Sequence, residues 1–197
     1  LLCHVRYSSY VPAFLFGLHV LFLADYTSAA GVHHSLFCRI SASQDTKERG
    51  AELVSALSVS CAASCCTAGV IVLFARLLYT GSFRTVAISV ACFLPLYGMN
   101  KILLSYANSL ELFGTLALGK GIRYVLSLGT FFLFSILGID GSLALLCFAG
   151  GEIVLFIFLL GKFYREIVHV SFSMTYMHRH LSFGWKTAGS DMILDWN

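Results

Sequence analysis

Residues 143–162 read LALLCFAGGEIVLFIFLLGK, an apolar run that contains one charged residue, Glu152, and ends at Lys162. A run of about 20 apolar residues is long enough for an α-helix to cross the hydrocarbon core of a bilayer. A helix that is apolar on every side is surrounded either by a large protein core or by lipid. The stretch therefore predicts a membrane-spanning helix that carries Glu152 near its centre.

The composition of the whole chain decides between these two surroundings. Of the 197 residues, 58% are hydrophobic and 12% are charged, whereas soluble domains have about 45–50% apolar and about 25% charged residues. The mean hydropathy is +0.82. The net charge of +3 is small and the basic residues are spread along the chain, which does not indicate a nucleic-acid partner. We therefore expect an integral membrane protein whose partners are membrane lipids.

Five apolar segments are close to the length of a membrane span. They cover residues 11–36, 53–79, 86–107, 122–138 and 142–160, and a sixth begins near Phe183. Tyrosines lie near the segment ends, as in the aromatic belts at membrane–water interfaces. The pattern predicts an all-α fold, a polytopic membrane helix bundle of about five spanning helices plus the start of a sixth. We expect a single membrane domain over residues 1–197.

The positions of Lys and Arg predict the orientation of this bundle. Ten fall on one side of the predicted membrane: Arg39, Lys47, Arg49, Lys101, Lys120, Arg123, Lys162, Arg165, Arg179 and Lys186. Three fall on the other: Arg6, Arg76 and Arg84. Basic loops tend to stay in the cytoplasm, so we expect a multi-pass protein of the inner (cytoplasmic) membrane with its first residue outside. Since the chain starts at Leu1 and stops where a sixth segment begins, we expect an internal piece of a longer protein.

Two opposite charges fall at similar depth in the predicted spans. At the rise of an α-helix, Asp25 lies about 21 Å and Lys101 about 22 Å from the outer face. Charges within a bilayer are costly and usually have partners. We expect an Asp25–Lys101 ion pair with Asn100 beside it; the alternative is that each side chain snorkels to the cytoplasmic face. For Glu152, a functional cavity and a structural hydrogen bond are both open.

Other polar residues have simpler interpretations. Ala56, Ser60, Ser64 and Ala68 repeat every four residues in the second segment, a pattern typical of close helix packing. We expect Pro95 to be a tolerated kink within the third segment. His33 and His34 are expected to be solvated near the inner interface. Residues 165–180 are predicted to form an amphipathic helix lying on the inner surface, with a metal or phosphate site there disfavoured.

The sequence shows no motif typical of an enzyme. It has no nucleophile elbow, phosphate-binding loop or zinc-protease helix. Cys65 and Cys66 are adjacent and Cys61 lies one turn before them, but no second cluster completes a metal-binding set. We expect no catalytic residue, metal or cofactor. Transport, conduction and scaffolding remain as function classes.

The order of these features resembles that of a known family. Residues 21–57, LFLADYTSAAGVHHSLFCRISASQDTKERGAELVSAL, are similar to the second helix, charged loop and third helix of polysaccharide or oligosaccharide flippases. Residues 93–165, from FLPLYGMNK to LLGKFYR, resemble helices four to six of that family, and residues 180–197, HLSFGWKTAGSDMILDWN, the start of helix seven. Thr27 stands where the family commonly has glycine.

The resemblance implies a transporter of two six-helix lobes, of which this chain would supply most of the first lobe without its first helix. Such a transporter moves a lipid-linked oligosaccharide, a polysaccharide or O-antigen precursor, across the cytoplasmic membrane by alternating access, with a coupling ion. On this basis the candidate cavity or substrate-binding residues are Asp25, Arg39, Asn100, Lys101 and Glu152.

Two other function classes stay open. A proton-conducting stator subunit of a rotary ATPase needs an arginine that faces the rotor, together with acidic half-channels, and Arg123 and Glu152 could take these roles. Arg123 lies at a segment end beside Lys120, without the asparagine-rich surroundings that such a subunit has. The third class is a structural membrane subunit that transports nothing.

Overall fold

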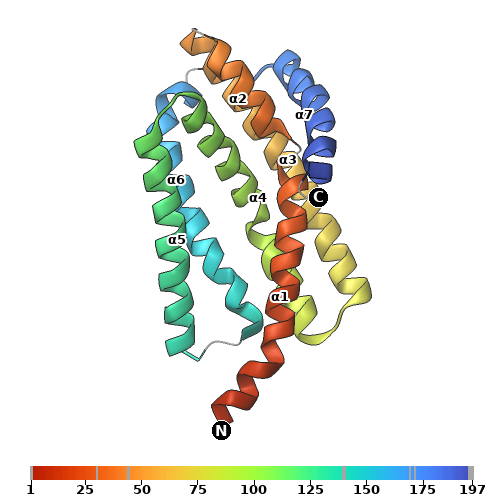
Figure 1. The fold of residues 1–197 in the computed structure, drawn as a ribbon. Coiled ribbons are helices and arrows are strands. Elements are labelled where there is room, and N and C mark those ends of the chain that lie inside the picture. The colour runs from red at the N-terminus through yellow and green to blue at the C-terminus, as the bar shows by residue number, and fades with distance from the viewer. Residues whose placement is uncertain are drawn as a thin grey trace.

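The structure is a computed structural model that describes residues 2–29, 31–43, 45–138, 141–168, 170 and 172–194. Of residues 2–11, 141–142, 185 and 187–194 it describes the backbone alone. Within these ranges the regular elements are α1 (Leu2–Ser28), α2 (Val32–Ala42), α3 (Thr46–Leu78), α4 (Gly81–Ser109), α5 (Phe113–Ile136), the short 3-10 helix η1 (Gly141–Leu146), α6 (Cys147–Val168) and α7 (Met174–Leu194). The expected all-α fold is confirmed (Figure 1).

Four of these helical stretches are long and apolar enough to cross a membrane. They are α3, α4, α5 and Leu143–Val168, which joins the end of η1 to α6. Pro12–Ser28 of α1 and α2 make a fifth if they are one span with a bend of 45° between them. The chain is therefore a multi-pass membrane helix bundle, as its apolar segments predict.

The helices are longer than the predicted segments, most clearly in α5. The sequence predicts a span over residues 122–138, whereas α5 already begins at Phe113. Lys120 lies among three glycines and resembles a polar loop, yet all of these residues are helical. A Cβ atom at Gly119 would lie 3.1 Å from side-chain atoms of Leu104 and of Leu155, which is a tight contact. The glycine allows α5 to approach its neighbours closely.

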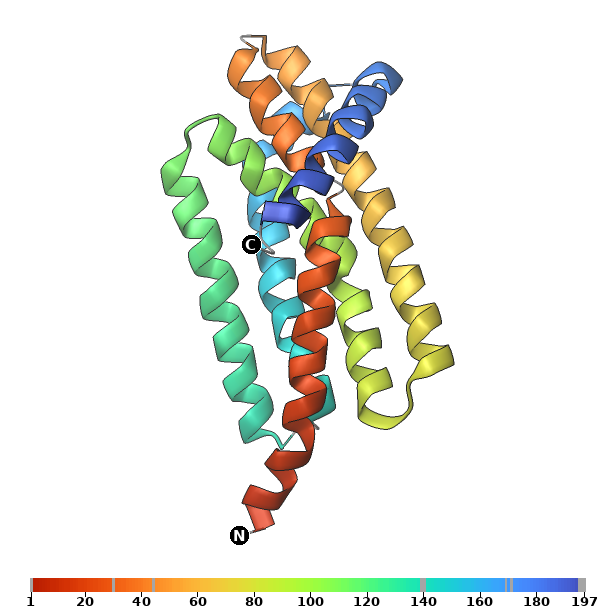
Figure 2. The same ribbon diagram turned by 45° about the vertical axis from the view of Figure 1, so that its right-hand side comes forward.

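Helix α4 is the centre of the bundle. It packs against α1, α2, α3, α5, η1 and α6, and Figure 2 shows it among these helices. Its buried side chains include small, aliphatic and aromatic residues along most of its length. Most of the main apolar core lies around Leu103 and Tyr106 of α4, and a second core lies around Val86 and Val90 nearer its first turn.

Helix α5, by contrast, lies at the edge of the bundle (Figure 1). Its buried residues are Gly119 and Ser127. The large apolar side chains that it exposes are Phe113, Leu118, Tyr124, Val125, Leu128, Phe131, Phe132, Leu133 and Ile136. An apolar surface of this extent on a long helix is what contact with lipid tails requires.

The connections sort to the two ends of the bundle in agreement with the predicted topology. The α2–α3, α4–α5 and α6–α7 connections gather at one end, and the α3–α4 and α5–η1 connections lie at the other (Figures 1 and 2). The first end carries the loops that are richest in Lys and Arg. That this end faces the cytoplasm stays a prediction of the positive-inside rule. Residues 139 and 140 of the opposite turn lie outside the described residues.

The prediction of one amphipathic helix over residues 165–180 is wrong. Helix α6 runs on to Val168, and α7 begins only at Met174. The segment between α6 and α7 contacts Ser55 of α3, whose hydroxyl group donates to Ser173 O at 3.2 Å. Helix α7 packs against α2 and α3, where its His180 is fully buried and its Met177 is partly buried against the main apolar core. His169 lies outside the described residues.

Candidate functional site

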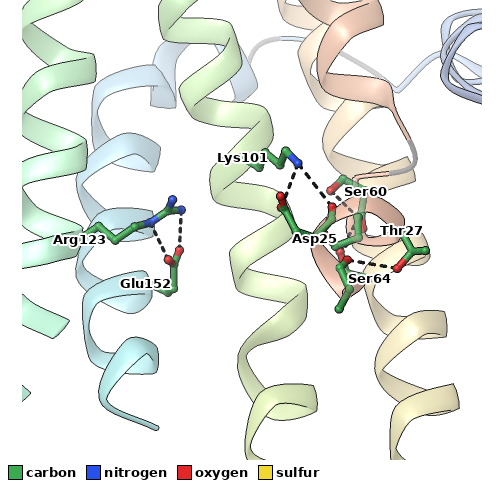
Figure 3. Close-up of polar contacts among 9 residues, drawn as sticks. Asp25, Thr27, Ser60, Ser64, Lys101, Arg123 and Glu152 are labelled. Carbon is green, nitrogen blue, oxygen red and sulfur yellow. Dashed lines mark hydrogen bonds and ion pairs between the residues drawn. The ribbon is translucent and has the colours of Figure 1, made fainter. Parts of the chain in front are cut away.

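Lys101 of α4 and Asp25 of α1 form an ion pair inside the bundle (Figure 3). Lys101 Nζ lies 2.9 Å from Asp25 Oδ1 and 3.4 Å from the backbone oxygen of Asp25. Lys101 stands eight residues before the end of α4 at Ser109, which places it about 12 Å from that end. The contact predicted from matched depth is therefore present, and its role in substrate binding stays a prediction.

The ion pair lies where α1 gives way to α2. Helix α1 ends at Ser28 and α2 begins at Val32. Gly31 between them has a φ of 66°, a left-handed conformation that glycine adopts at little cost. A helix end leaves its last four carbonyl groups without partners in the helix. Within a membrane, these groups need donors from elsewhere in the protein.

Two serines of α3 supply such donors. Ser60 Oγ and Ser64 Oγ both donate to the backbone oxygen of Ser28, at 3.2 and 2.7 Å. Gly98 of α4 makes room for this meeting of three helices, because a Cβ atom there would collide with Ser64 Oγ and lie 3.1 Å from Ser28 O. The row of small residues predicted to serve packing therefore also completes the hydrogen bonding of a broken helix.

A second ion pair lies on the other side of α4, between α5 and α6 (Figure 3). Arg123 Nε lies 2.6 Å from Glu152 Oε1, and an Arg123 Nη atom donates to Oε2 at 3.0 Å. Asn100 of α4 donates to the same Oε2 at 2.7 Å and to the backbone oxygen of Glu152 at 2.8 Å. The structure thus gives Glu152 partners from two other helices, and its side chain is 2% exposed.

Asn100 is not beside the Asp25–Lys101 pair as the sequence predicts. Successive residues of an α-helix point about 100° apart, so Asn100 faces α6 while Lys101 faces α1. Asn100 is fully buried, and its Oδ1 atom has no hydrogen-bond partner in the described part of the chain. The nitrogen of the amide, and not its oxygen, faces Glu152, because the backbone oxygen and the carboxylate of Glu152 are both acceptors.

Tyr97 lies between the two ion pairs. Its ring packs under the Arg123 guanidinium, with 5.1 Å from Cζ to the ring centroid, and its hydroxyl group interacts with the Asp25 carboxylate. Tyr97 stands one helical turn before Asn100 and Lys101 on α4. Four helices therefore contribute to one polar layer, which sequence reasoning recognised only in part.

Arg39 does not join this layer. Its Nε atom lies 2.7 Å from Glu52 Oε1 of α3, near the end of the bundle. Glu52 is buried, and its Oε2 lies 2.8 Å from Nε2 of the fully buried His180 of α7. The other ring nitrogen of His180 lies 3.0 Å from Ser35 Oγ. This second cluster ties α2, α3 and α7 together, and sequence reasoning found neither Glu52 nor the burial of His180.

The remaining polar or special residues from the sequence are His33, His34 and Pro95. His34 is exposed, as expected of a solvated residue, whereas His33 is half-buried, and the two ring centroids lie 4.0 Å apart with the rings tilted by 40°. Pro95 lies within the continuous helix α4. Among the described residues, no group of three or more His, Cys, Asp or Glu side chains could hold a metal ion.

No protein-family model, curated protein or solved structure matches this chain.

Proposed function

We propose that this chain is most of the first membrane-spanning lobe of a transporter that moves a lipid-linked oligosaccharide across the cytoplasmic membrane by alternating access. The observation that carries the proposal is the broken helix of α1 and α2, at which Asp25 and Lys101 pair inside an apolar bundle. Irregular backbone at membrane depth is tolerated where protein covers it or where it lines a water-filled path. Transporters build their binding sites at such broken helices.

The exposure of the ion pair supports movement at this site. The side chains of Lys101 and Asp25 are 24% and 30% exposed, so either group can change partner without unpacking the core. Ionisable residues within spans mark the paths of substrates and ions. The diphosphate of a lipid-linked sugar requires a cation in the cavity, and Lys101 would supply it.

The substrate class comes from the sequence resemblance. Residues 21–57, which resemble the second helix, charged loop and third helix of the flippases, include Asp25. Residues 93–165 include Asn100, Lys101 and the second ion pair. The residues of the polar layer thus come from the two segments that resemble the flippases.

Transport fits the contacts of Arg123 better than proton conduction by a stator subunit. A stator arginine has to face the rotor. In the part of the chain that the structure describes, Arg123 is bound to Glu152 and stacked on Tyr97 within the bundle. These contacts turn the guanidinium toward the protein interior.

Flipping can be measured in proteoliposomes that contain the purified protein and a fluorescent lipid-linked oligosaccharide. A membrane-impermeant quencher reads the fraction of labelled lipid in the outer leaflet. We expect quenching to continue after the outer-leaflet lipid has been quenched, because transport brings inner-leaflet lipid to the outer leaflet. We expect Asp25→Asn to slow this second phase of quenching. Quenching that stops where protein-free vesicles stop would overturn the proposal.

Two controls isolate the transport step. Lys120→Ala removes an exposed cation of α5 and should leave the rate unchanged. Fluorescent phosphatidylcholine in the same vesicles reports general scrambling of lipids, which should stay at the protein-free level. Equal movement of both lipids would identify a scramblase without selectivity for the sugar.

A further inference from the structure

The α1–α2 break brings oxygen atoms of α1 and α3 close together, and two of those from α1 contact the Lys101 ammonium group. The carboxylate and backbone oxygen of Asp25 and the backbone oxygen of Ser28 come from α1, and the hydroxyl groups of Ser60 and Ser64 come from α3. Ser60 and Ser64 hydrogen-bond to Ser28 O, and Ser28 Oγ donates to Asp25 O at 3.0 Å. Carboxylate, carbonyl and hydroxyl oxygens are the ligands that hard cations take in proteins.

A cation is already present at this site, in the form of the Lys101 ammonium group. It lies against both the carboxylate and the backbone oxygen of Asp25. A lysine ammonium is a compact point charge, so its size and charge resemble those of an alkali cation. Unwound carbonyls and the carboxyl ends of half-helices bind Na⁺ in transporters with broken helices. The oxygen set therefore has the chemistry of a cation site.

We propose that the α1–α2 break is a binding site for a monovalent cation, and that Lys101 occupies it as a tethered cation in this conformation. When the lysine side chain withdraws, a free alkali cation takes its place. Asp25 is the carboxylate of the set, and one negative charge balances one positive charge. A divalent ion would leave an uncompensated charge inside the membrane, at a high cost.

This cation site would hold the coupling ion of the proposed transporter. Only the coupling role of the ion rests on the proposed function. Binding itself can be tested without transport. A ligand that binds the folded state raises the unfolding temperature by mass action. If Lys101 fills the site, only a variant without the lysine should respond to the free ion.

The test compares unfolding temperatures in detergent micelles, in sodium chloride and in N-methyl-D-glucamine chloride at equal ionic strength. The native protein should unfold at the same temperature in both. Lys101→Ala should be stabilised by sodium in a saturable manner, by roughly 3–5 °C at ten times the dissociation constant. Lys101→Met, which keeps the apolar length of the side chain, is the second variant.

Matched variants give the test its specificity. Lys120→Ala removes an exposed lysine elsewhere and should show no difference between the two salts. Adding Asp25→Asn to Lys101→Ala should abolish the sodium response, because the carboxylate is lost. An equal unfolding temperature of Lys101→Ala in both salts would overturn the proposal, and so would failure of both lysine variants to fold in sodium.

The outcomes separate the two proposals. A sodium response without flipping leaves the cation site and removes the transport function. Flipping without a sodium response removes the cation site and leaves the transporter.

Discussion

The two ion pairs on either side of α4 differ in how firmly they are held. Glu152 is 2% exposed and has partners on α4 and α5, whereas Asp25 is 30% exposed and its ion-pair partner is Lys101. Arg123 uses two of its nitrogen atoms on Glu152, and Lys101 uses its single nitrogen on Asp25. The Arg123–Glu152 pair lies between regular helices, and the Asp25–Lys101 pair lies at a helix break.

This difference predicts different roles for the two pairs. A buried charge that loses its partner is strongly destabilising, so the Glu152 pair is suited to holding α4, α5 and α6 together. A pair that is part-exposed at a break is less costly to open. In the proposed transport cycle, we expect motion to centre on Asp25 and Lys101 while the Glu152 pair stays closed.

The largest effect is expected at Glu152. Glu152→Ala leaves Arg123 without its carboxylate partner inside the bundle and leaves the Asn100 amide with the backbone oxygen of residue 152 alone; breaking a buried pair in this way costs about 3–5 kcal/mol. We expect that loss in the free energy of unfolding in mixed detergent micelles. Replacing both Glu152 and Arg123 with leucine should recover a large part of it, since no charge is then left unpaired. A loss no greater than that of Lys120→Ala would show that the pair does not hold the helices.

The next effect is expected at Gly98, where α1, α3 and α4 meet. A Cβ atom there collides with Ser64 Oγ, and overpacking of this kind costs about 1–3 kcal/mol. Gly98→Ala should therefore lower the free energy of unfolding. Gly69→Ala is the matched control, because Gly69 lies in α3 with nothing within 4 Å of its added Cβ. Equal unfolding free energies of the two variants would mean that the three helices do not approach each other closely.

A smaller coupling is expected between Asp25 and Lys101. The pair is part-exposed, so the interaction energy in a double-mutant cycle of Asp25→Ala and Lys101→Ala should be about 1 kcal/mol, within the range for residues in contact. The free energies of unfolding of the two single variants and the double variant give this value. Strict additivity would mean that the residues do not touch, and snorkelling would then explain Asp25.

The sequence predicts the membrane spans well, because apolar run length is a direct physical requirement of the bilayer. It predicts their ends less well. Helices continue into polar sequence, as α3 does from Thr46. Lys120 and its neighbouring glycines look like a loop and lie within α5.

The candidate site shows the same limit more sharply. Depth along a helix follows from residue number, and it predicts the Asp25–Lys101 contact. The direction in which a side chain points follows from packing, so Asn100 could not be assigned to Glu152 from sequence alone. Glu52 and His180 look like surface residues because they lie near polar stretches, and only the packing of α7 on α2 and α3 buries them.

The smallest effect is expected from the serines that complete the broken helix. Ser64→Ala removes one of two donors to Ser28 O and leaves Ser60 Oγ in place, so the loss in the free energy of unfolding should be about 0.5–1 kcal/mol. The double variant Ser60→Ala/Ser64→Ala removes both donors. An unsatisfied buried carbonyl costs more than a single lost hydrogen bond, and the double variant should therefore lose more than the sum of the two single variants. Ser58→Ala, at an exposed position of the same helix, is the control and should change little. If the two serine losses only add, Ser28 O is satisfied by another donor, and the break does not depend on α3.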